Sequence, residues 1–308
     1  MRGGYPLALP RRHSGLLALT ALPRYHQPLF HLQTNRAKVK LPENRTFAAP
    51  PVNEVSMSVV TSGTGILDPY DVRGLHHRVP HLPRVQNQPG VMALQIAALV
   101  GGASNSPMSA NFSPSRWWFL SDDETRVAQI QNDIFAYNWR RINPRFGQPF
   151  EYPGFTSILK EFKETILSLN GTADFSGITY SPSGCELFYE DIIPLKRADG
   201  TQFKLSQVLS ECKRVVDSIN LINWSNGWLE VLSHLPDQQK PLLKVDINAL
   251  TVVNPDNMET MPVLRIGWTA GAARSTWEGV VDFFETAHSY MLSRFNTLIE
   301  DGIKETWV

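Results

Sequence analysis

A stretch rich in aromatic residues, at positions 116–141, constrains the fold of this 308-residue chain more than any other segment. It reads RWWFLSDDETRVAQIQNDIFAYNWRR and contains three runs that alternate as β-strands do. An acidic turn at 122–125 and a tight turn at 132–133 join the runs into an antiparallel meander. The turns set the expected cross-strand pairs, which are Trp118–Gln129, Leu120–Val127, Val127–Asn138, Gln129–Ala136 and Gln131–Ile134.

This register gives the meander two faces of different chemistry. The apolar face can only belong to a core, and it holds Trp117, Phe119, Ala128, Ile130, Phe135, Tyr137 and Trp139. The mixed face holds Trp118, Leu120, Val127, Gln129, Gln131, Ile134, Asn138 and Arg140. A mixed face has three interpretations: it faces solvent, lines a cleft, or lies beneath a helix.

Periodicity predicts further elements along the chain. Strands are expected at 52–61, 185–194, 242–253 and 263–269, with ambiguous segments at 91–100, 205–212 (helix) and 215–224 (strand). Helices are expected at 155–169 and from a capping box at Ser275 and Glu278 to about residue 299. This order predicts an α+β fold in which long helices pack on one face of an antiparallel sheet or sheets. The same order is compatible with a loose internal duplication, in which each half ends its sheet with a long helix.

The first 46 residues differ in composition from the rest. The first 42 hold seven Arg and Lys and no Asp or Glu, and they lack a clear signal-peptide cleavage site. We therefore interpret residues 1–46 as a disordered leader or as the product of a start codon placed too far upstream. The folded chain is expected to divide into a first α+β half at 47–200 and a second half at 201–308, which ends in a hairpin and a long helix.

Charge and cysteine content limit the partners and the compartment. The 22 basic and 29 acidic side chains that follow residue 42 argue against broad nucleic-acid binding by the folded body. Cys185 and Cys212 show no metal-ligand or disulfide spacing, which is typical of a reducing, cytoplasmic compartment. No run approaches 18 apolar residues, so no membrane association is expected.

Sequence motifs of common enzymes and cofactor sites are absent. The chain has no phosphate-binding loop, no nucleophile elbow and no zinc-ligand pattern, so we predict no cofactor and no metal. His76, His77 and His81 lie close together, but Pro80 and Pro83 prevent a helix that would place them on one face. Surface or loop histidines explain them better than a metal site does.

A weak candidate site remains on the mixed face of the meander. Gln129, Gln131, Asn138 and Arg140 form an amide–arginine row, which suits a planar polar ligand or a partner backbone. The competing interpretation is an ordinary exposed or covered sheet face.

Two further residues outside the meander join the candidate set. Glu190 would pair with Arg140 if the strand at 185–194 lies near the meander, although a solvated strand face is favoured for Glu186, Glu190 and Asp191. His288 lies in the apolar stripe of the last helix, where a buried histidine bonded to backbone or tyrosine is the usual explanation.

The residues RWWFLSDDETRVAQIQNDIFAYNWRR and FEYPGFTSILKEFKETI resemble a sporadically distributed family of bacterial proteins of unknown function. The shared pattern is an aromatic strand, a V-x-Q-x-Q strand, an N-W-R strand and a Y-P-x-F helix, over about residues 48–308. The resemblance implies no activity and no site residues. Its patchy distribution implies an accessory or defence-locus component.

These observations favour a non-enzymatic cytoplasmic protein that binds an unidentified protein or a small polar ligand through the mixed face or through a cleft. The first alternative is an enzyme acting on a nucleotide or nucleic acid, with Arg140, Glu190 and His288 in one pocket. The second alternative is a structural subunit of a larger complex.

Overall fold

The computed structural model describes residues 50–61, 69–89, 115–131, 134–142, 151–170, 181–196, 200–210, 225–232, 241–253 and 258–307. All of them belong to one compact unit of the chain, Leu32–Val308. The predicted leader and the predicted elements at 91–100 and 215–224 lie outside the described residues, as do the last two residues of the helix expected at 205–212.

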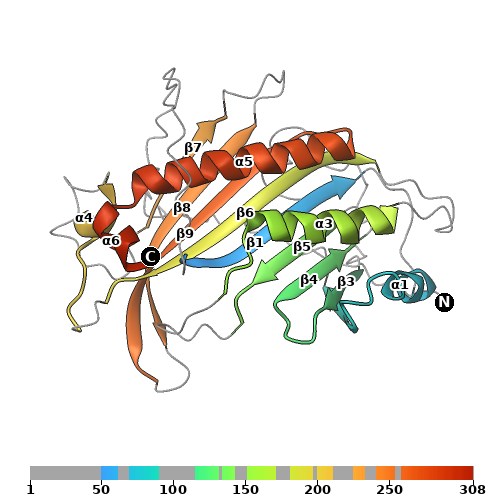
Figure 1. Cartoon of the computed structure of the whole chain (residues 1–308), viewed down its shortest axis with the longest axis horizontal. Helices are drawn as coiled ribbons and strands as arrows, with labels where there is room; N and C mark the ends of the chain where they lie inside the picture. Colours follow the sequence, from blue (N-terminus) through green and yellow to red (C-terminus); the bar gives the residue numbers. More distant parts are fainter. Residues whose placement is uncertain are drawn as a thin grey trace, which may run out of the picture. The chain divides into compact units, whose positions relative to one another are not determined.

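The described residues form one nine-stranded sheet in which all the pairings are antiparallel (Figure 1). Its strand order is β2-β3-β4-β5-β1-β6-β9-β8-β7. The strands are β1 Val52–Thr61, β2 Arg84–Pro89, β3 Ser115–Leu120, β4 Arg126–Ile130, β5 Ile134–Arg140, β6 Pro182–Pro194, β7 Ser225–Val231, β8 Leu242–Val253 and β9 Thr260–Ala272. The antiparallel pairing predicted from the sequence is thus confirmed.

The predicted fold class is wrong, because strands dominate the described residues and all belong to one sheet. The 13-residue strand β6 pairs with β1 along one edge and with β9 along the other, so the strands form one continuous sheet. Only three described helices have eight residues or more, α1 Pro69–His76, α3 Phe155–Asn170 and α5 Trp277–Leu298. The shorter helical elements are α4 Leu205–Val208, α6 Asp301–Lys304 and the 3-10 turn η2 Glu305–Trp307.

The predicted register of the meander is confirmed. Trp118 faces Gln129 between β3 and β4, and Gln129 faces Ala136 between β4 and β5. Because side chains alternate along each strand, this register separates the aromatic core face from the polar face. Phe119, Tyr137 and Trp139 are accordingly buried on the first of these faces.

The hydrophobic core lies between the sheet and the two longer helices. Figure 1 shows α3 in front of β5 and α5 crossing β6 and β9. Phe162 of α3 meets Phe284 of α5 edge to face at 5.4 Å between ring centroids, and Lys163 forms an ion pair with Glu285. The two helices therefore contact each other as well as the sheet.

Helix α5 begins one residue later than the predicted capping box. Thr276, not Ser275, is the N-cap, and its hydroxyl accepts a hydrogen bond from the Gly279 amide at 3.1 Å. Phe283 and Ala287 are buried on this helix together with Phe284 and Met291. None of the described helices is long and apolar enough to cross a membrane.

Candidate functional site

A cavity of about 290 Å³ lies between the sheet and α5. Its walls are mostly apolar, and only a few polar side chains face it. The lining residues are Pro50, Pro51, Val52, Tyr152, Pro153, Gly154, Phe155, Tyr189, Asp191, Trp268, His288, Met291, Leu292 and Phe295. An apolar hollow with a few converging polar groups is the usual form of a small-molecule site.

Strand and helix periodicity place these side chains around one space. Tyr189 and Asp191 are two residues apart on β6, so both point to the face that α5 covers. Trp268 on β9 lies directly opposite Tyr189 in the register. His288 and Phe295 are seven residues apart on α5, which is two helical turns, so they face the sheet together.

A short chain of hydrogen bonds runs along one side of the cavity. The hydroxyls of Tyr152 and Tyr189 are 3.4 Å apart, and the Tyr189 hydroxyl lies 3.0 Å from Nδ1 of His288. Burial raises the pKa of both tyrosines above the ordinary value. Both phenols are therefore neutral hydrogen-bonding groups at neutral pH.

His288 is held between aromatic rings. Its imidazole stacks on the ring of Phe155, with centroids 4.0 Å apart and planes 9° apart, and it also stacks near Tyr189. Burial lowers the pKa of His288 to about 4. The histidine is therefore neutral at physiological pH, because the apolar surroundings disfavour its cationic form.

Asp191 is the acidic group of the cavity. Its side chain is buried, with 5% of the residue exposed, and Oδ2 accepts a hydrogen bond of 2.9 Å from Nε1 of Trp268. Burial raises the pKa of Asp191 to about 7, a rise that the bond from Trp268 opposes and the charge of Glu190 reinforces. Within the described part of the chain, Oδ1 has no hydrogen-bond partner.

The opposite face of the sheet carries a polar row that crosses five strands, from β3 to β6. Gln129 accepts hydrogen bonds from Arg116 and Trp118, both at 3.1 Å, and donates one of 3.0 Å to Asn138. Asn138 in turn donates to Glu54 at 2.9 Å. The side-chain amides of Gln129 and Asn138 thus already form hydrogen bonds with each other and with side chains on neighbouring strands.

The polar row continues into a pair of glutamates. Glu54 on β1 and Glu190 on β6 are cross-strand partners. Burial raises the pKa of Glu54, and the charge of Glu190 adds to that rise. Glu190 accepts hydrogen bonds from Arg265 and, at 2.7 Å, from Asn53. Arginine on β9 therefore compensates part of the negative charge.

The structure brings together some of the residues predicted as a site. The polar face of the sheet holds four of them, Gln129, Asn138, Arg140 and Glu190. The guanidinium of Arg140 stacks over the ring of Trp118, 5.5 Å from its centroid, and donates a hydrogen bond of 3.2 Å to the backbone carbonyl of Glu124. Gln131 is buried at the end of β4. Glu190 and Asp191 are buried as well, which corrects the prediction of a solvated strand face.

His288 lies on the other side of the sheet from these residues. It contacts Tyr189, whose side chain points away from that of its neighbour Glu190. Arg140, Glu190 and His288 therefore do not line one pocket. Among the described residues, no group of His, Cys, Asp and Glu has an arrangement that could hold a metal ion.

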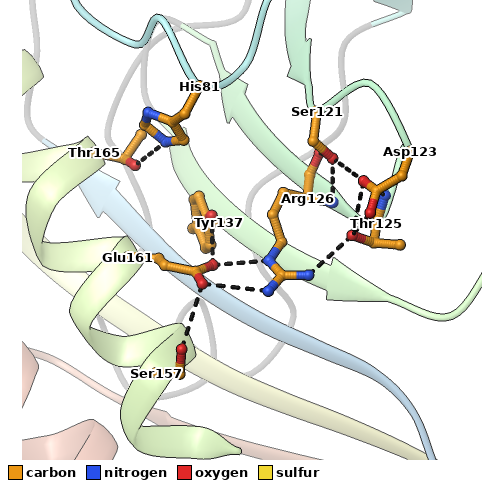
Figure 2. A network of polar contacts seen from close by, with 9 residues as sticks. All are labelled: His81, Ser121, Asp123, Thr125, Arg126, Tyr137, Ser157, Glu161 and Thr165. Atoms are coloured by element: carbon orange, nitrogen blue, oxygen red, sulfur yellow. Dashed lines mark hydrogen bonds and ion pairs between the residues drawn. The ribbon is translucent and has the colours of Figure 1, made fainter. Parts of the chain in front are cut away.

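A third polar cluster fastens α3 to the meander (Figure 2). Arg126 on β4 donates two hydrogen bonds to Glu161 on α3, at 2.9 and 3.3 Å, and the Tyr137 hydroxyl donates a third at 2.9 Å. Burial alone raises a carboxyl pKa, but here the bonds from Arg126 and Tyr137 outweigh it and lower the pKa of Glu161. The carboxylate of Glu161 already accepts these charge-assisted hydrogen bonds, so the cluster serves to hold α3 against the meander.

Most of the cavity residues were not predicted from the sequence. Asp191 carried a usable signal, since the period of two places it on the same side of the strand as Leu187, Tyr189 and Ile193, which are apolar or aromatic. A carboxylate on a core-facing position is uncommon and indicates either a partner or a site. Trp268 and Tyr152 carried no such signal, because only the tertiary fold brings them to Asp191.

Neither the protein-family models nor the curated proteins give a relative of this chain. No family model matches the chain, and no curated protein matches it, which is consistent with a sporadically distributed family of unknown function. Among solved structures, the chain is aligned with an inhibitor of motility from Bacillus subtilis (MotI/DgrA). The alignment has 7% sequence identity and a TM-score of 0.12, and covers 81% of this chain and 99% of that chain. A TM-score this low carries no argument about fold or function.

Proposed function

We propose that this chain is a binding protein, and that its ligand is a small, largely apolar molecule held in the cavity between the sheet and α5. The observation that carries the proposal is the combination of apolar walls with the inward-facing polar groups of Tyr189, Asp191 and His288. Apolar walls supply affinity by excluding water, and a few fixed polar groups supply orientation.

The volume of the cavity limits the size of the ligand. An apolar protein cavity of about 150 Å³ is large enough to bind benzene. The cavity here is about 290 Å³, so one substituted ring or a pair of fused rings fits it. A nucleotide with its phosphates is too large and too highly charged for this space.

Binding is favoured over catalysis by the states of the reactive groups. His288 is neutral and confined between Phe155 and Tyr189, so it is poorly placed to exchange a proton at neutral pH. Cys185 is buried under the helices, and burial raises the pKa of its thiol, which disfavours the thiolate needed for nucleophilic attack.

The cavity is also favoured over the polar row as the ligand site. Gln129, Asn138 and Glu54 already bond to one another across adjacent strands. A ligand on that face would have to replace these bonds, whereas the cavity offers space and an unused carboxylate oxygen. We further propose a cytoplasmic location and an accessory or defence-locus role, on the cysteine content and the family resemblance.

A fragment screen with a cavity-blocking variant tests this function. Ligand-observed NMR is recorded with a library of one-ring and two-ring fragments on the wild type, on Leu292→Trp and on Leu250→Trp. Leu292 lines the cavity and is only partly buried, whereas Leu250 is exposed on β8 and provides the matched control. Fragments should bind the wild type and Leu250→Trp, and lose binding to Leu292→Trp.

Two results would overturn the proposal. The first is that no fragment binds the wild-type protein, which decides the matter even if Leu292→Trp does not fold. The second is that a folded Leu292→Trp variant, checked by circular dichroism, binds the same fragments as the wild type.

A further inference from the structure

The most unusual group in the cavity is a buried carboxylate, beside which the described residues place no cation. Asp191 is 5% exposed, and from the described residues it receives one hydrogen bond, from Trp268 to Oδ2. No lysine or arginine is present among the described residues that line the cavity. A buried carboxylate is normally paired with a cation, because desolvation disfavours its charge.

The groups that face Asp191 do not supply the missing positive charge. Tyr152 and Tyr189 on one side are neutral phenols, and their pKa values are raised by burial. His288 on α5 is neutral because burial lowers its pKa. The carboxylate of Glu190 also acts on Asp191, and its charge has the same sign.

Aromatic rings surround the remaining space. Trp268, Tyr189 and Phe155 line the cavity together with Tyr152 and Phe295. The faces of aromatic rings carry partial negative charge, so such walls attract organic cations as well as apolar groups. The walls and the carboxylate thus favour the same kind of ligand, which has an aromatic body and a cationic end.

We propose that the ligand of this cavity is an arylalkyl amine, whose ammonium group donates a hydrogen bond to Oδ1 of Asp191 while its ring packs among the aromatic walls. This inference rests on the proposed function and specifies the ligand class of the same site. The ammonium ion supplies two things that the described residues do not give Asp191, a hydrogen-bond donor for Oδ1 and a compensating positive charge.

Isothermal titration with a matched pair of probes tests the ligand class. 2-Phenylethylamine carries the cation, and 2-phenylethanol has the same length and ring but is neutral. At pH 8 the wild type should bind the amine at least about tenfold more tightly than the alcohol, since a buried charge pair contributes to one ligand only. Asp191→Asn, which keeps an acceptor for Trp268, should reduce amine affinity at least about tenfold and change alcohol affinity by less than about threefold.

The pH dependence provides a second measurement on the wild type. Protonation of Asp191 removes the charge that holds the ammonium, so the amine affinity should fall as the pH is lowered from 8 to 6, while the alcohol affinity should stay nearly constant. Both probes carry a constant charge over this range.

The outcomes separate the two proposals. Equal binding of amine and alcohol, unaffected by Asp191→Asn, overturns the amine proposal and leaves the cavity as a binding site for neutral molecules. Preference for the amine that survives in Asp191→Asn also overturns it, because the charge is then recognised elsewhere. Binding of either probe that persists in a folded Leu292→Trp variant overturns the proposed function itself.

Discussion

Tyr189 and Glu190 are adjacent in the chain, yet their side chains lie on opposite faces of the sheet. The tyrosine bonds to His288 in the cavity under α5, and the glutamate bonds to Arg265 in the polar row. Strand β6 thus contributes side chains to two separate sets of polar groups. One set lines the cavity beside α5, and the members of the other set, the polar row, bond to one another. The difference between them is the reason for assigning ligand binding to the cavity.

Asp191→Asn is expected to change the pH dependence of stability. Because burial raises the pKa of Asp191 to about 7, the folded state holds a proton between pH 4 and 7 that the unfolded state has released. This group therefore makes the unfolding free energy fall with rising pH in that window, by about 1.4 kcal/mol per pH unit. From pH 5 to pH 7, the variant should gain about 2 kcal/mol relative to the wild type, measured by urea denaturation, because the slope falls off as the pH approaches 7. If the unfolding free energies of the two proteins changed in parallel with pH, a raised pKa of Asp191 in the folded state would be contradicted.

His288→Asn is expected to act in the opposite direction. Burial lowers the pKa of His288 to about 4, so between pH 4 and 6.5 the unfolded state holds a proton that the folded state lacks. In the wild type this group makes the unfolding free energy fall by about 3 kcal/mol as the pH drops from 6.5 to 4. The variant should lose that contribution, so its stability relative to the wild type should rise toward pH 4. A constant difference across the range would count against a buried neutral histidine.

Glu161→Gln tests the anchor of α3. The glutamate receives hydrogen bonds from Arg126 and Tyr137, so its replacement leaves a partly buried arginine without its charged partner. We expect a loss of about 1–3 kcal/mol in unfolding free energy by urea denaturation. Glu164→Gln, on an exposed part of the same helix where the residue pairs with Lys160, is the matched control and should change stability by less than about 0.5 kcal/mol. Equal effects of the two variants would exclude the anchor role.

Phe162→Ala tests the contact between the two helices. The ring is fully buried and meets Phe284 edge to face, so its removal leaves a cavity at the junction of α3, α5 and the sheet. A loss of about 3–5 kcal/mol is expected in thermal or chemical denaturation. Phe162→Leu keeps most of the volume and should cost clearly less. If both variants cost the same, packing volume at this position is not what stabilises the junction.

Glu54→Gln tests the glutamate pair of the polar row. The glutamine keeps an acceptor for Asn138 and removes the repulsion from Glu190. Because burial raises the pKa of Glu54, its charge is unfavourable in the folded state, and the variant should be as stable as the wild type or more stable at pH 8. A marked loss of stability in urea would show that the charged form supports the row.

The meander could be predicted from the sequence because its information is local. Strict alternation and short turns set the register, and the predicted pair Trp118–Gln129 is present. The prediction of the last helix also depended on local periodicity, with an error of one residue at the cap. The choice between Ser275 and Thr276 as N-cap depends on backbone angles that the sequence does not specify.

The single sheet and the cavity could not be predicted in the same way. Strand β6 pairs with β9 across about 70–90 residues of sequence and with β1 across about 120–140 residues, and the sequence carries no local signal for either pairing. The cavity requires Tyr152, Asp191, Trp268 and His288 to meet, and these come from four separate elements. The local signal was the position of Asp191 in the strand alternation, which places a carboxyl group on the core-facing side of β6.

The most direct test of the binding site uses the methyl groups of methionine as reporters. Met291 lines the cavity, whereas Met258 is 74% exposed and lies outside the lining. Protein labelled with ¹³C at the methionine methyls is titrated with 2-phenylethylamine and with 2-phenylethanol, and its methyl spectrum is recorded. The account predicts a saturable shift of the Met291 resonance with at least one probe and no shift of Met258. A Met291 resonance that stays unmoved with both probes, or moves only together with Met258, would contradict it.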